Sequence, residues 1–146
     1  MRTGSPRRRG RHGAPEIEAA FEAITQQEDA LTDRLLSYLR SRNDCQIVGQ
    51  PVNRDSARVP TISFRFDGRD AAEICKAVDE EKIAIRFGDF HARRLAEYLD
   101  VTDHNGVLRV SMVHYNTIDE VDRLTAAFDR ILAGDVGTVP PARRAG

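Results

Sequence analysis

Residues 106–120 constrain the fold more than any other part of the chain, because they predict a strand that runs directly into a capped helix. Apolar and polar residues alternate after Gly106, as they do in a strand with one buried face. The apolar face holds Leu108, Val110 and Met112. Arg109 lies on the opposite face with Ser111, where a guanidinium either remains solvated or binds a carboxylate through two hydrogen bonds. Thr117 and Glu120 then have the spacing of a helix capping box.

The remaining apolar periodicities alternate between those of helices and those of strands. They predict, in order, a long amphipathic helix at 16–41, a short strand at 45–48, a strand at 59–66, a helix at 70–81, a strand at 82–86, a helix at 89–99, the strand at 107–113 and a last helix at 117–133. A sheet of three or four strands with helices packed on one face would bury these apolar stripes. The connections are long enough for parallel crossovers, so the pattern leaves the strand order open. The first helix has more apolar surface than so small a sheet covers, which leaves part of it for a neighbouring surface.

The composition is that of one ordinary globular domain without a membrane span. The chain has 146 residues, of which 40% are hydrophobic and 31% are charged. It contains no run of 18 apolar residues, and its basic start lacks the apolar stretch of a secretory signal. The two cysteines, Cys45 and Cys75, have no partner pattern and predict free thiols in the cytoplasm. The four histidines have no metal-ligand spacing, so we expect no metal site.

Charge is distributed unevenly along the chain, and a basic segment stands at its start. Residues 1–12 carry five arginines and no acid. Without these five, 17 basic residues face 23 acidic ones, so the rest of the chain has a net charge of −6. We predict a disordered basic tail at 1–15 and a second disordered tail at 135–146. An arginine-rich tail can contact nucleic acid, but this one has no aromatic residue and the acidic body would repel phosphate, so nucleic-acid binding is not favoured.

Three stretches, taken in order and at their spacing, resemble one known family. They are Ile83-Ala-Ile-Arg-Phe-Gly-Asp-Phe-His-Ala92, Gly106-Val-Leu-Arg-Val-Ser111 and Tyr115-Asn-Thr-Ile-Asp-Glu120. They resemble the C-terminal part of class V aminotransferases and, within these, the cysteine desulfurase-like proteins. In that family an Arg-x-Gly-x-x-Cys-Ala loop precedes a Gly-x-x-Arg-[Val/Ile]-Ser strand and a Tyr-Asn-Thr-x-x-Glu helix start. The resemblance extends back through 59–64 and the first helix, so it covers 16–133.

The resemblance implies an α+β fold and pyridoxal 5'-phosphate chemistry. Members of the family have a large domain that holds the cofactor and a small C-terminal domain that closes over the substrate. Residues 16–134 resemble that small domain, in which helices cover a largely antiparallel sheet of three to four strands. The long first helix resembles the helix that links the two domains. The family also implies an amino-acid substrate and a homodimer.

The resemblance assigns roles to three residues of this chain. Arg109 falls on the arginine that binds the α-carboxylate of the substrate, and Arg86 falls on the first residue of the cysteine loop. His91 stands where a cysteine desulfurase has its sulfur-accepting cysteine. An imidazole cannot store sulfur as a persulfide, so cysteine desulfuration is not expected. His91 is either a catalytic proton-transfer group or a residue at a helix start that only forms a hydrogen bond.

The chain lacks the motifs with which such enzymes hold their cofactor. Its two lysines, Lys76 and Lys82, do not follow a histidine or serine as the Schiff-base lysine does in the family, and no glycine-rich phosphate loop is present. Two hypotheses follow. In the first, the chain is the C-terminal domain of a pyridoxal-phosphate-dependent enzyme, inactive alone and completed by a large domain that is lost or encoded separately. In the second, it is a non-enzymatic interaction or dimerisation module that kept the fold and lost the chemistry.

Overall fold

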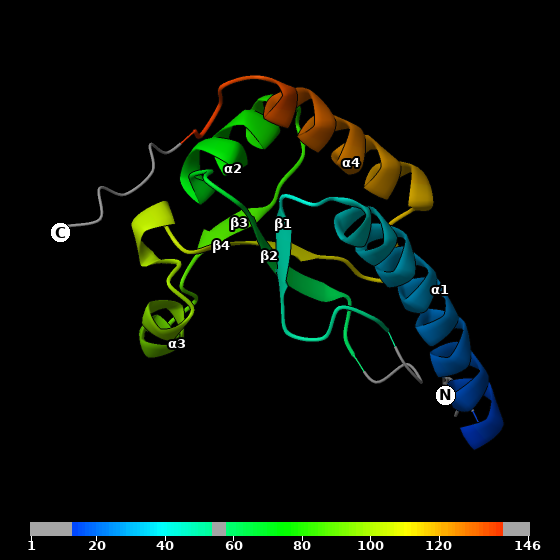
Figure 1. The fold of residues 1–146 in the computed structure, drawn as a ribbon. Helices are drawn as coiled ribbons and strands as arrows, with labels where there is room; N and C mark the ends of the chain where they lie inside the picture. Colours follow the sequence, from blue (N-terminus) through cyan, green and yellow to red (C-terminus); the bar gives the residue numbers. More distant parts are fainter. Residues whose placement is uncertain (1–12, 54–57, 139–146) are drawn as a thin grey trace, which may run out of the picture.

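One antiparallel sheet forms the centre of an α+β fold (Figure 1). The computed structural model describes residues 13–53 and 58–138. The strands are β1 (Cys45–Val48), β2 (Thr61–Phe66), β3 (Arg86–Gly88) and β4 (Val107–Ser111). Their order across the sheet is β1-β2-β4-β3, and each neighbouring pair is antiparallel. The antiparallel sheet of three to four strands that the resemblance implies is therefore confirmed.

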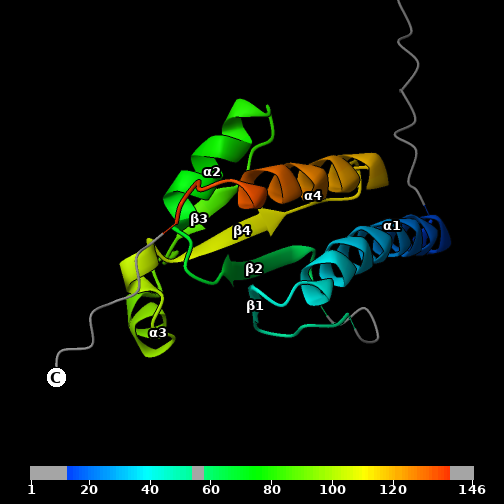
Figure 2. The same cartoon turned by 45° about the horizontal axis from the view of Figure 1, so that its top comes forward.

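Three helices cover one face of this sheet. They are α1 (Ala14–Ser41), α2 (Ala71–Glu80) and α4 (Ile118–Ala133), and Figure 2 shows α2 and α4 above the sheet. A short helix, α3 (Arg93–Tyr98), lies on the other side, followed by a 3₁₀ turn at Thr102–His104. There Ala96 and Val101 pack against Val107 of β4. The expectation of helices on one face only is therefore wrong for α3, because a second, small apolar cluster forms on the opposite face.

The main core lies between the sheet and the three covering helices. Strands β2 and β4 turn alternate residues toward it, as the sequence predicts, and the six buried side chains are Ile62, Phe64, Phe66, Leu108, Val110 and Met112. Phe128 of α4 is fully buried, and its ring meets the rings of Phe64 and Phe66 edge-on at centroid distances of 5.8 and 5.5 Å. This aromatic cluster holds α4 against β2.

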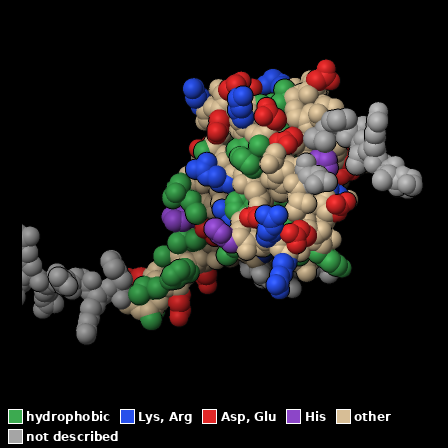
Figure 3. Space-filling view, turned by 90° about the vertical axis from the view of Figure 1, so that its left-hand side faces the viewer, with side chains coloured by type: hydrophobic (Ala, Val, Ile, Leu, Met, Phe, Trp, Pro, Cys, Tyr) green, Lys and Arg blue, Asp and Glu red, His purple; other side chains and the backbone are tan. Residues whose placement is uncertain are grey.

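The two halves of α1 differ in what they contact. The buried residues of the helix, Leu31, Thr32, Leu35, Leu36 and Leu39, all lie in its second half. In the first half, Ile17 and Phe21 are 48% and 64% exposed. Figure 3 shows this end of the helix as an arm that projects from the body of the molecule and carries hydrophobic side chains. The predicted excess of apolar surface on this helix is confirmed. None of the described helices, including this long one, is apolar enough over a sufficient length to cross a membrane.

Capping residues predict the starts of two helices, and both caps form. The Thr117 hydroxyl accepts from the backbone N–H of Glu120, whose carboxylate accepts from the N–H of Thr117 at 2.9 Å. Asp70 accepts from two backbone N–H groups in the first turn of α2. The spacing of Asp70 and Glu73 also predicts a capping box, but the backbone N–H of Asp70 donates to the carbonyl of Gly137 at 2.6 Å and not to the Glu73 carboxylate.

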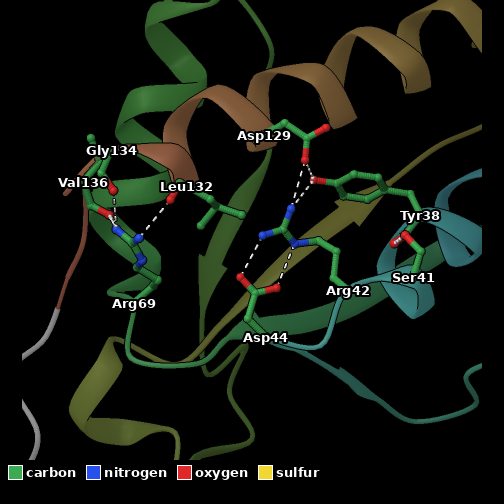
Figure 4. Close-up of polar contacts among 9 residues, drawn as sticks. All are labelled: Tyr38, Ser41, Arg42, Asp44, Arg69, Asp129, Leu132, Gly134 and Val136. Atoms are coloured by element: carbon green, nitrogen blue, oxygen red, sulfur yellow. Dashed lines mark hydrogen bonds and ion pairs between the residues drawn. The ribbon is translucent and has the colours of Figure 1, made fainter.

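Two arginines tie the ends of the helices together (Figure 4). Arg42, which follows α1, forms ion pairs with Asp44 at 2.7 Å and with Asp129 of α4 at 2.9 Å. The hydrogen bond from this guanidinium holds the pKa of Asp44 below its usual range. Arg69 donates to the carbonyls of Leu132, Gly134 and Val136. These bonds hold the chain beyond α4 close to the start of α2. The rest of the predicted tails, 1–12 and 139–146, lies outside the described residues.

The predicted boundaries are wrong between residues 82 and 99. The predicted strand 82–86 is displaced to β3, and the predicted helix 89–99 is shortened to α3. The backbone has positive φ angles of 60° at Lys82, 50° at Phe90 and 67° at His91. Residues in this conformation interrupt both helices and strands. The Asp89 side chain accepts from the backbone N–H of His91 at 3.0 Å, so it closes a turn and does not cap the helix.

Candidate functional site

A single row of side chains crosses the face of the sheet that α1, α2 and α4 leave open. The strand register pairs Val48 with Ser63, Ser63 with Arg109, and Arg109 with Arg86. Residues paired in this way point to the same side, with Cβ atoms about 5 Å apart. Arg109 therefore stands between a hydroxyl group and a second arginine. The pairing places the two arginines at neighbouring strand positions, and the Arg86 guanidinium itself donates to the carbonyl of Ile85 at 3.2 Å.

The guanidinium of Arg109 is stacked on an aromatic ring. Its Cζ lies 3.7 Å from the centroid of the Phe90 ring, which is a cation–π contact. Its Nε is buried and has no hydrogen-bond partner among the described residues. Within residues 13–53 and 58–138, Arg109 also forms no ion pair. One face of the guanidinium is thus covered while its N–H groups have no acceptor in the described part of the chain, an arrangement that suits a carboxylate.

The loop at residues 88–92 carries Phe90 over Arg109. Gly88 and Gly106 have φ angles of 131° and 84° and lie against each other. A Cβ atom on Gly106 would collide with the carbonyl group of Gly88, so a larger residue there would push the loop away. Phe90 and its successor then adopt left-handed conformations that are uncommon for bulky residues. The strain falls where the loop meets Arg109, as backbone strain does at many functional sites.

The three residues assigned by the resemblance lie along this row and loop. Arg86 is exposed next to Arg109, and it donates to the carbonyl of Ile85 at 3.2 Å. His91 follows Phe90 in the loop and is also exposed. The structure therefore places the two arginines at paired positions of β3 and β4, and it places the histidine in the adjoining loop.

Two further residues join the site without having been expected from the sequence. The sequence pattern assigns Phe90 to the apolar stripe of a helix, and it treats Ser63 as an ordinary polar position in a strand. The signal for Ser63 is the alternation itself, because polar residues of 59–66 share the face that carries Arg109. The signal for Phe90 is the Gly-Asp pair that precedes it, since both residues favour turns.

A hollow of about 140 Å³ lies beside this row, between the sheet and α3. Its walls include Val48, Ser63, Phe90, Leu95, Leu99 and Val107. Most of these side chains are apolar. Because Ser63 is paired with Arg109 and Phe90 is stacked on it, the hollow adjoins the arginine.

The sequence matches the family model of aminotransferase class V over residues 16–124. The chain belongs to the class V aminotransferase family. It is 36% identical over 113 residues to the aminotransferase-like protein FGM3 of Gibberella zeae, a match that covers 77% of this chain and 28% of that protein. It is 34% identical over 109 residues to a probable cysteine desulfurase of Pseudomonas aeruginosa, covering 75% of this chain and 25% of the relative. This class V chain therefore spans about a quarter of the length of these curated relatives.

Solved structures of cysteine desulfurases have the same fold. The S-sulfonic acid form of the Escherichia coli cysteine desulfurase CsdA matches with a TM-score of 0.62 at 27% identity, covering 75% of this chain and 25% of that chain. The apo cysteine desulfurase of Thermococcus onnurineus matches with a TM-score of 0.68 at 21% identity, covering 82% of this chain and 28% of that chain. The second likeness concerns the fold alone.

Neither cysteine of this class V chain lies in the row or the loop. Cys75 is buried in α2, and its Sγ lies 3.5 Å from the carbonyl oxygen of Ile85. Cys45 lies in β1 and packs against the main core. Both thiols are free. Burial raises the pKa of Cys45 to about 12 and also raises the pKa of Cys75. Neither side chain is therefore a reactive thiolate at neutral pH.

We expect both thiols of the native chain to resist alkylation by iodoacetamide at about pH 8, because only a thiolate attacks the reagent. In denaturant the pKa of Cys45 returns toward its ordinary value of 9.0, and both thiols should then react readily. The raised pKa of Cys45 also contributes to the free energy of unfolding. This contribution is fully present below about pH 9 and is lost as the pH rises toward 12, since the unfolded state releases the thiol proton first. Mass spectrometry of the labelled chain measures the reaction. Rapid labelling of either thiol in the native chain would contradict the burial described here.

The described residues do not fit pyridoxal phosphate. Lys76 is exposed on α2, which lies on the opposite face of the sheet from Arg109. Lys82 is exposed in the turn after α2. Neither amine is in a position to share a ligand with Arg109. In the described ranges there is also no group of three or more His, Cys, Asp or Glu residues that could hold a metal ion.

Proposed function

We propose that this chain acts as the small, substrate-closing domain of a pyridoxal-phosphate-dependent class V enzyme whose substrate is an amino acid. The observation that carries the proposal is the state of Arg109. Its guanidinium stands in the middle of the open sheet face, is stacked on Phe90 and has no acceptor in the described chain. A cation placed in this way is suited to hold the carboxylate of a substrate.

In this function each residue near Arg109 has a stated task. Arg109 binds the carboxylate in bidentate fashion, and Phe90 keeps the guanidinium plane in place. Arg86, at the paired position of β3, is the candidate for a second positive charge near the carboxylate. His91 is the candidate for a proton transfer to or from the substrate, since its side chain is exposed in the loop that bears Phe90. We do not propose cysteine desulfuration, although several relatives have that name, because neither thiol lies at the site.

The cofactor is proposed to come from a large domain, either in the same polypeptide or in another one. Pyridoxal phosphate supplies the Schiff-base chemistry of such enzymes. The contribution of this chain is then to bind the carboxylate, to orient it and to exclude water by closing over it. The family's dimeric state is proposed for the complete enzyme. The two free thiols suit a reducing compartment such as the cytoplasm.

Incubating the chain with pyridoxal phosphate and reducing with borohydride should leave no stoichiometric adduct. Both lysines are exposed and neither faces Arg109, so they should react only as ordinary surface amines do. Peptide mapping by mass spectrometry measures the modification, with free Nα-acetyl-lysine as the reference for unspecific reduction. A stoichiometric adduct on Lys76 or Lys82 would overturn the proposal that a separate large domain holds the cofactor.

A second candidate function, a non-enzymatic interaction module, is favoured by the arm of α1. Ile17 and Phe21 are largely exposed there, on the half of the helix that does not contact the main core. As a dimerisation module the chain would self-associate through this stripe. Light scattering of the native chain and of Phe21→Ser separates the two functions. Self-association that is lost in the variant, together with no carboxylate binding at Arg109, would favour the module.

A further inference from the structure

We infer that the amino acid bound through Arg109 has an apolar side chain, and that this side chain occupies the hollow between the sheet and α3. The inference rests on the proposed function and adds a substrate class to it. It starts from the position of the hollow, which shares Phe90 and Ser63 with the surroundings of Arg109. A carboxylate held by Arg109 therefore leaves the rest of a small ligand next to the mouth of the hollow.

The chemistry of the walls excludes a charged or strongly polar side chain. Most of the lining consists of apolar groups, which come from β1, α3, β4 and, with Phe90, from the loop at 88–92. The charged residue in the lining, Asp89, has its Oδ1 engaged by the backbone N–H of His91. A polar group transferred into such a site would lose its hydrogen bonds to water without replacement. An apolar group would gain from the same transfer.

The volume of the hollow sets the size of the side chain. An apolar cavity of about 150 Å³ takes up a molecule as large as benzene. A hollow of about 140 Å³ therefore has room for a branched aliphatic or small aromatic side chain. A methyl or thiomethyl-sized group would leave most of the space empty. The residues that line the hollow would then lack van der Waals contacts with the ligand.

Arg86 suggests an alternative, namely a substrate whose side chain carries a second acidic group. It stands on the other side of Arg109 from Ser63, at the edge strand β3, and its side chain is exposed. An acid bound there would remain in contact with water and gain little from the charge. The apolar side of Arg109, toward the hollow, is therefore the better source of selectivity, and the acidic substrate is kept as an outcome of the test.

The test is an NMR titration of the ¹⁵N-labelled full chain with straight-chain carboxylates from acetate to hexanoate. If the hollow takes the alkyl group, affinity should rise about two- to fourfold with each methylene and level off when the hollow is full. Signals of residues around the hollow should shift together with that of Arg109. The primary amide of valerate should not bind, since it lacks the charge.

Filling the hollow from its rim provides the matched variant. Ala92 is exposed and lines the hollow, so the larger side chain of Ala92→Leu should occupy part of it. The affinity should then rise less with each methylene of the carboxylate, while the affinity for acetate stays unchanged. The same exchange at an exposed site on α4, Ala126→Leu, is the control and should change neither.

Two results would overturn the inference in different ways. Equal affinity for acetate and valerate in the unmodified chain, or tighter binding of succinate than of butyrate, would show that the hollow is not used. The proposed function would survive that result as long as binding still required Arg109. If no carboxylate shifts the signals around Arg109, the proposed function fails as well.

Discussion

Arg109→Gln is expected to lower the affinity of the chain for valerate by roughly a hundredfold or more. The exchange removes two charge-assisted hydrogen bonds, each of which contributes about 1.5–3 kcal/mol when the donor or acceptor is charged. Glutamine retains a polar side chain but no charge, and it cannot offer the paired N–H groups of a guanidinium. The NMR titration measures the change directly. In a complete enzyme, kcat/KM for the amino-acid substrate should be lower in the same variant by a comparable factor.

Arg109→Lys and the stability of the variants serve as controls. Lysine keeps the charge but loses the planar fork, so it should recover only part of the affinity. The free energy of unfolding, measured by thermal denaturation, should change by about 1 kcal/mol or less in either variant. This is the size of the lost cation–π contact with Phe90. A loss of several kcal/mol would instead mean that Arg109 is a structural residue of the fold. Unchanged valerate binding in Arg109→Gln would remove the basis of the proposed function.

Phe128→Ala is expected to destabilise the chain by about 3–5 kcal/mol, the usual loss when a fully buried phenylalanine is truncated. Its ring contacts Phe64 and Phe66 edge-on and is stacked with Tyr38 at 6.4 Å. Removing it leaves a cavity between α4, α1 and the sheet. Because small domains are stable by only about 5–15 kcal/mol, the variant should be close to unfolding.

Urea denaturation followed by circular dichroism measures this loss, with Tyr115→Ala as the matched control. Tyr115 is 76% exposed, so its truncation should change the free energy of unfolding by about 0.5 kcal/mol or less. A small effect of Phe128→Ala would mean that α4 is not fixed against the sheet by the aromatic cluster. The two variants together therefore test the packing that positions the open face.

The parts of the fold that the sequence predicts are those encoded by neighbours in the chain. The alternation of Leu108, Val110 and Met112 depends on strand geometry alone, and their burial is confirmed. The cap at Thr117 needs only Glu120 three residues later. Such signals survive whatever the tertiary contacts are.

The parts that the sequence does not predict depend on contacts between distant segments. Lys82 and Phe90 adopt left-handed conformations for which lysine and phenylalanine have no preference, so no local pattern predicts the displaced strand or the shortened helix. The row from Val48 to Arg86 requires the strand order, which the pattern left open. The stacking of Phe90 on Arg109 joins residues 19 positions apart and becomes visible only in three dimensions. The roles of His91 and Arg86 stay predictions.

The contact between Gly88 and Gly106 has a consequence for how proteins of this shape can diverge. With no side chain at either position, the two backbones touch directly, and their separation is set by main-chain atoms. Substitutions at the tip of the loop can then exchange one chemical group for another at a fixed distance from the arginine. Selectivity can change through single replacements there, whereas a larger residue at position 106 would displace the whole tip at once.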